Sequence, residues 1–111
     1  MEPRNLYLVL PDKTEVHNHY MPMLDGGGIF VPTNDDFDFN ETVVVQVDLL
    51  SEKNKAAVPG KVVWITPVGA QRGLMKGVGV QFKGEHQGKL QQYFEGLIGD
   101  NLLQEPAFPS Y

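Results

Sequence analysis

Residues 58–82 read Val58-Pro-Gly-Lys-Val-Val-Trp-Ile-Thr-Pro-Val-Gly-Ala-Gln-Arg-Gly-Leu-Met-Lys-Gly-Val-Gly-Val-Gln-Phe82, and this stretch decides the fold. Its first part, Lys61 to Thr66, is rich in β-branched and aromatic side chains, while Val78, Val80 and Phe82 recur at every second position. Both patterns are typical of strands, and the second places its three apolar side chains on one core-facing side. Proline and glycines interrupt the segment between the two runs. The stretch therefore predicts a β-hairpin with a long connection.

Composition limits the classes of function that fit the chain. Its 111 residues are enough for one domain, and with no cysteine it has no disulfides or thiolate sites. The beginning of the chain has no apolar run of the length that a signal peptide or a membrane span needs. The net charge is −5, which opposes nucleic-acid binding because the basic residues are scattered. We expect a cytoplasmic protein, without membrane insertion, that does not bind nucleic acid.

Four further runs have the alternation or composition of strands. They are Asn5 to Leu10, Thr14 to Tyr20, Ile29 to Val31 and Thr42 to Leu50. The first two are separated by a short turn, so they predict an opening hairpin. The polar and acidic segment from Thr33 to Asn40 predicts a loop held in place by its two phenylalanines.

After the central hairpin the apolar period changes from two to about 3.6. The residues that share one side at this spacing are Leu90, Phe94, Leu97 and Ile98. They predict one amphipathic helix that ends near Gly99 and packs on the sheet. Residues 100–111 contain two prolines and scattered apolar side chains, which predicts a flexible tail. Six strand-like runs and one helix favour a closed six-stranded antiparallel β-barrel followed by a C-terminal α-helix, with a two-sheet sandwich as the alternative.

Motifs for catalysis are missing from the sequence, because it has neither a phosphate loop nor a glycine fingerprint for dinucleotides. In the predicted second strand Glu15, His17 and His19 share one face, a spacing that can hold a divalent metal but more often forms a solvated face. The acidic residues from Asp35 to Glu41 lack the central glycine of a calcium loop. We expect neither an enzyme nor a resident metal or cofactor.

Exposed aromatic side chains are the remaining candidates for a binding surface. Tyr20, Phe30 and Trp64 lie in or beside predicted strands, where aromatic rings are more often part of the core. Trp64 and Ile65 are neighbours in a strand and point to opposite faces, so one of them faces outward. Near Tyr20 three consecutive glycines predict a turn with positive φ or a close backbone approach.

The chain resembles the PilZ domain family, in the branch associated with type IV pilus assembly. The residues that carry the resemblance are Tyr20-Met-Pro-Met-Leu-Asp-Gly-Gly-Gly-Ile-Phe-Val-Pro-Thr33, Val58-Pro-Gly-Lys-Val-Val-Trp-Ile-Thr-Pro-Val-Gly-Ala-Gln71 and Gly77-Val-Gly-Val-Gln-Phe82. The similarity runs from about Leu6 to Ile98. It implies a six-stranded barrel followed by a helix, with residues 1–99 as the PilZ domain and residues 100–111 as a tail.

Most members of this family are similar in binding cyclic di-GMP through an Arg-x-x-x-Arg motif and an (Asp/Asn)-x-Ser-x-x-Gly motif. When the last motif glycine is aligned with Gly28, Met23 replaces Asp or Asn and Asp25 replaces Ser, with Gly27 inside the motif. Arg4 is alone in its region. Paired guanidinium groups are needed to neutralise the two phosphates and to reach the guanine edges. The turn therefore resembles a degenerate form of the nucleotide motif.

This departure is shared with the pilus branch, and the resemblance implies a non-catalytic adaptor in type IV pilus biogenesis and twitching motility. The implied partners are a PilB-like pilus extension ATPase and, in some lineages of this branch, a FimX-like receptor protein with GGDEF and EAL domains. The residues expected to bind a partner are Tyr20, Met21, Phe30, Trp64 and Ile65. Direct binding of cyclic di-GMP is the alternative. We expect a monomer.

Overall fold

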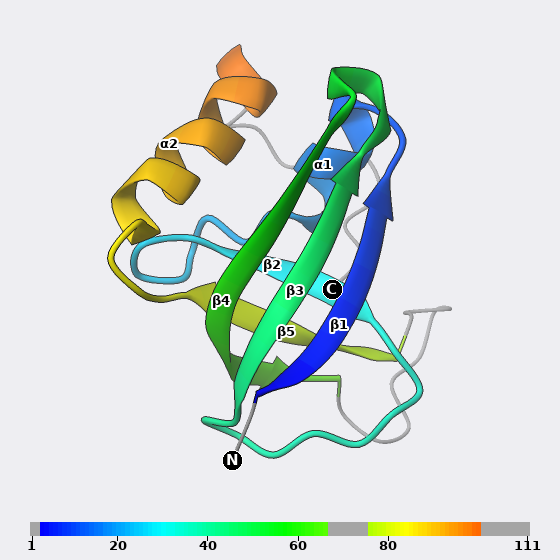
Figure 1. Ribbon diagram of the computed structural model, residues 1–111, viewed down its shortest axis with the longest axis vertical. Helices are drawn as coiled ribbons and strands as arrows, with labels where there is room; N and C mark the ends of the chain where they lie inside the picture. The colour runs from blue at the N-terminus through cyan, green and yellow to red at the C-terminus, as the bar shows by residue number, and fades with distance from the viewer. Residues whose placement is uncertain (1–2, 67–75, 101–111) are drawn as a thin grey trace.

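Figure 1 shows the computed structural model, which describes residues 3–66 and 76–100. In these ranges the elements are β1 (Arg4–Leu10), α1 (Lys13–His19), β2 (Gly28–Pro32), β3 (Thr42–Leu49), the short 3-10 helix η1 (Leu50–Glu52), β4 (Asn54–Ile65), β5 (Gly77–Phe82) and α2 (Gln87–Ile98). Residues 101–111 of the predicted tail 100–111, and residues 67–75 of the connection, lie outside the described residues.

The strands form one curled sheet in the order β1-β3-β4-β5-β2. β1 runs parallel to β3, with Leu6 opposite Val45, and the other pairs are antiparallel. The prediction of a closed six-stranded antiparallel barrel is wrong, as is the two-sheet alternative. The described chain has five strands in a half-barrel. Residue alternation reports which face of a strand is buried, but it does not report the direction of the neighbouring strand.

The second of the six predicted strands is a helix. Residues 13–19 form α1, and the Asp12 side chain accepts a hydrogen bond from the Glu15 backbone N–H at 2.9 Å. An N-cap of this kind satisfies a donor that the first helical turn leaves unpaired. Val16, Asn18 and His19 are the buried residues of the helix. The opening hairpin is therefore absent, and α1 carries the chain away from β1 to the opposite edge of the sheet.

The central hairpin is confirmed, since β4 pairs with β5 and Val62 lies opposite Val80. The core-facing set predicted for β5 is buried, and so are the alternate apolar residues of β1 and β3: Leu6, Leu8, Leu10, Val43, Val45, Val47, Leu49, Val78, Val80 and Phe82. Of the two phenylalanines expected to hold the loop, Phe37 is buried and Phe39 is 63% exposed. One apolar core therefore fills the concave side of the sheet.

The predicted amphipathic helix is also confirmed. In α2 the side chains of Phe94 and Ile98 are buried, and the helix ends at its C-cap Gly99, which has a φ of 65°. The Phe94 ring lies 5.4 Å from the Phe82 ring and 6.4 Å from the Tyr20 ring, measured between centroids. α2 thus closes the core by aromatic packing at the side of β5.

Candidate partner-binding surface

Phe30, Gly79 and Trp64 lie in register on three neighbouring strands. Phe30 of β2 is the partner of Gly79 in β5, and Gly79 is in turn the partner of Trp64 in β4. Ile29 and Val31, which flank Phe30, belong to the main core. Because successive side chains of a strand point to opposite faces, Phe30 and Trp64 lie on the outer face of the sheet.

Gly79 is the position at which this outer face requires a glycine. A Cβ atom there would lie 2.7 Å from Trp64 Cβ and 2.8 Å from Met21 Sδ, closer than such atoms approach in folded proteins. Similarly, a Cβ at Gly77 would lie 2.6 Å from Phe30 Cζ. The alternating glycines of β5 therefore leave a trough that Met21, Phe30 and Trp64 occupy, and we call these three residues the outer row.

Exposure differs sharply within the predicted binding set. Met21 and Phe30 are 3% and 0% exposed, while Trp64 is 38% exposed. Ile65 packs against the main core. The expectation that one of Trp64 and Ile65 faces outward is met by Trp64, and a register shift between Val62 and Trp64 accompanies this change of face. Of the predicted partner-binding residues, Trp64 alone presents a large apolar area to solvent.

Tyr20 lies on the opposite side of the sheet from the outer row. Its ring is 1% exposed, and its hydroxyl donates a 2.6 Å hydrogen bond to Glu95 Oε2 of α2. Burial, together with this hydrogen bond and the charge of Glu95, raises the pKa of Tyr20 above its usual value. The Tyr20 ring fills the space between the sheet and α2 and is not exposed. The expectation that Tyr20 is a surface anchor is therefore wrong.

The glycine turn leads from Tyr20 into β2. Gly26 and Gly27 have φ values of 78° and 84°, which a residue with a side chain adopts only with strain. Gly28 has no positive φ, but a Cβ there would lie 2.6 Å from the Val80 carbonyl oxygen. The Gly27 carbonyl accepts a 3.0 Å hydrogen bond from Phe82 N–H. The turn is thus bound to the end of β5.

Polar contacts also attach the turn to β5, while its tip is open to solvent. The Asp25 carbonyl accepts a 2.7 Å hydrogen bond from the Gln81 side-chain amide, and the Gly27 N–H donates to the Leu24 carbonyl at 2.8 Å. Met23 is 61% exposed. The degenerate motif residues therefore form a tightly bonded turn with an acidic residue at its tip.

Arg4 is already held by an ion pair at the beginning of β1. Its Nε and Nη2 atoms lie 2.6 and 2.8 Å from the Glu41 carboxylate oxygens, and the guanidinium carbon is 3.9 Å from the centre of the Phe37 ring. The hydrogen bonds from Arg4 and from Asp38 N–H lower the pKa of Glu41 to about 2. This guanidinium therefore anchors the loop that precedes β3. Arg72, the other arginine of the chain, lies outside the described residues.

The three residues considered for a metal lie on α1, and the helix gives them different surroundings. His19 is buried, with its Nδ1 atom 2.9 Å from the Glu15 carbonyl oxygen and 3.5 Å from the Glu15 carboxylate. His17 is half-buried. Across residues 3–66 and 76–100, no group of three or more histidine or acidic side chains has the arrangement of a metal site. Glu15, His17 and His19 would share one face in a strand, but in the helix α1 the three side chains do not all lie on the same side.

Comparison with protein families gives one match. The model of the PilZ domain matches residues 3–96, which covers every described strand and most of α2. A search among curated proteins gives no significant match. Among the described residues, no helix has the length and apolar character needed to cross a membrane.

Proposed function

Because the chain belongs to the PilZ domain family, whose members are in general non-catalytic binding or adaptor domains, we propose that it is an adaptor in type IV pilus biogenesis and twitching motility. In this proposal it binds the pilus extension ATPase, and a degenerate cyclic-di-GMP receptor protein is a second partner. The pilus assignment rests on the sequence resemblance described above. The chain conveys a signal by contact and carries out no chemistry itself.

The observation that carries the adaptor proposal is the state of Arg4. Its guanidinium is occupied by Glu41 and by the Asp36 carbonyl oxygen, to which Nη2 donates at 2.7 Å. A phosphate ligand would have to break this bidentate pair before it gained any contact. At the glycine turn the same ligand would meet the exposed Asp25 carboxylate, which repels it.

Trp64 is the residue we assign to the contact with the ATPase. A half-exposed tryptophan held in a fixed position by close packing on a glycine is a typical interface anchor, since little conformational freedom is lost on binding. Met21 and Phe30 are buried, so their side chains are not presented to the partner. Ile65 contributes through the core to the position of β4.

Replacing Trp64 tests this proposal. We expect Trp64→Ala to weaken capture of the purified ATPase by about 2 kcal/mol, or roughly thirtyfold in Kd. The circular dichroism spectrum should remain that of the wild type. Phe39→Ala is the matched control, because Phe39 is an exposed aromatic residue that does not belong to the outer row. An unchanged Kd for Trp64→Ala would remove this surface from the proposal, as would an equal loss for both variants.

Direct binding of cyclic di-GMP is the rival function, and the family itself is the reason to test it. Titration calorimetry of the purified protein at low salt should show no saturable heat. A micromolar Kd, equivalent to about 8 kcal/mol of binding free energy, would contradict the adaptor proposal. Glu41→Ala releases Arg4 and serves as the control. If a single free guanidinium is insufficient, this variant should also give no heat.

A further inference from the structure

The two edges of the sheet differ in how they are covered. At the β2 edge, Met21 N–H donates to the Gly28 carbonyl at 2.9 Å and Tyr20 forms a bridge with Ile29. At the other edge, β1 pairs with β3 on one side only. Across residues 3–66 and 76–100, no backbone hydrogen bond joins β1 to any element other than β3. Among the described residues, the border of β1 that faces away from β3 therefore has backbone donors and acceptors without a backbone partner, and Figure 1 shows β1 at an edge of the sheet.

The sequence of β1 has few of the features that usually block an edge strand. Natural edges carry lysines, prolines or bulges that prevent pairing with another chain. From Asn5 to Leu10 the strand has no charged residue and no proline, and its pairing with β3 is regular throughout. Its outward side chains include Tyr7 and Val9, which are 73% and 58% exposed. Such an edge is a template for a further strand.

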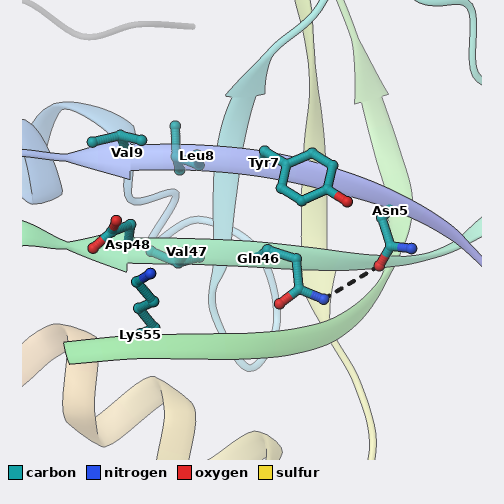
Figure 2. Close-up of a pocket in the computed structure, with 8 residues that line it drawn as sticks. All are labelled: Asn5, Tyr7, Leu8, Val9, Gln46, Val47, Asp48 and Lys55. Atoms are coloured by element: carbon teal, nitrogen blue, oxygen red, sulfur yellow. Dashed lines mark hydrogen bonds between the residues drawn. The ribbon is translucent and has the colours of Figure 1, made fainter.

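A groove accompanies the edge on the outer face of the sheet. The groove has a volume of about 390 Å³. Its lining residues lie on β1, β3 and β4 (Figure 2). The Tyr7 ring lies along β1. At one end of the groove Val9 of β1, Asp48 of β3 and Lys55 of β4 lie side by side on neighbouring strands. Gln46 Nε2 donates to Asn5 Oδ1 at 3.3 Å at the other end. A strand added to β1 would place every second side chain beside this groove.

We propose that the β1 edge binds an extended segment of another protein, which pairs with β1 as a sixth strand and has apolar side chains at alternate positions and basic residues at its ends. Only an extended chain has donors and acceptors at the spacing that this edge presents. The net charge of −5 repels a second copy of the chain and attracts a basic segment. This surface is additional to Trp64 and does not depend on it.

The probe for the test is a synthetic peptide of alternating valine and threonine with a lysine at each end. Amide exchange measured by nuclear magnetic resonance should slow by about tenfold at alternate residues of β1 when the peptide is added, because alternate N–H groups face the free edge. The same peptide with N-methyl groups on its pairing amides should give no protection. A glutamate-ended version should bind more weakly than the lysine-ended one.

Two variants separate this proposal from the proposed function. Tyr7→Ala should reduce affinity for the peptide and leave ATPase capture unchanged, whereas Trp64→Ala should do the reverse. Protection at β2 instead of β1, equal binding of the N-methylated peptide, or equal binding of the two charged versions would overturn the proposal. Concentration-dependent protection of β1 without peptide would also overturn it, because a second copy would then be the occupant.

Discussion

Tyr20 offers the sharpest test of the packing described here, because its ring is part of the core in the structure although it was among the residues expected to bind a partner. Replacing a buried aromatic residue by alanine costs about 3–5 kcal/mol. At 1% exposure Tyr20 belongs in this range, and its contacts with Phe82 and Phe94 would also be lost. For a domain of this size, Tyr20→Ala should lower Tm by roughly 12–20 °C.

Tyr20→Phe isolates the hydroxyl. A hydrogen bond to a charged acceptor contributes about 1.5–3 kcal/mol. The lower end applies here, because Glu95 is only partly buried and also accepts from Gln91 Nε2 at 3.3 Å. We expect a loss of about 1.5 kcal/mol, or roughly 6 °C in Tm. Tyr7→Phe is the matched control, since Tyr7 is 73% exposed and should change stability by less than about 0.5 kcal/mol.

The pH dependence gives an independent check on the same hydrogen bond. The pKa of Tyr20 is raised in the folded state, so above about pH 10 the unfolded chain loses a proton that the folded chain keeps. The free energy of unfolding should therefore fall as pH rises beyond this value, and the fall should be smaller in Tyr20→Phe. Urea unfolding at several alkaline pH values measures it. A wild-type Tm for Tyr20→Ala together with lost ATPase capture would refute the argument and restore Tyr20 as a surface anchor.

Two other perturbations test the turn and the ion pair. Gly28→Val places a side chain against the Val80 carbonyl oxygen and should destabilise the domain by about 1–3 kcal/mol. Urea unfolding measures this loss. A wild-type midpoint would point to a ligand-contact role for the turn. Glu41→Gln should weaken the domain at neutral pH and flatten its acid unfolding curve. The pKa of Glu41 is depressed in the folded state, so its contribution is present above the unfolded value of 4.5 and is lost as pH falls toward 2. Unchanged acid unfolding in Glu41→Gln would show that Arg4 contributes nothing through this pair.

Residues 13–19 form a helix although their alternation predicted a strand. Two signals in this part of the sequence conflict, and the one for a helix is the stronger. Residues 14–20 alternate weakly, but Asp12 and Glu15 stand three residues apart, the spacing of a helix N-cap. Val16, His19 and Tyr20 are also three and four residues apart, and all three are buried. A cap followed by this spacing is evidence for a helix, and it was available without the structure.

Sequence alone determined the strands whose alternation is strong, their buried faces, the amphipathic helix and its end at Gly99, because side-chain period depends only on local geometry. The tertiary structure decided what local geometry does not contain. Four features depend on residues that are distant in the chain: the parallel pairing of β1 with β3, the place of β1 at an edge of the described sheet, the inward position of Tyr20 and the ion pair of Arg4 with Glu41. Such contacts are chosen by the packing of the whole domain, and no window of sequence reports them.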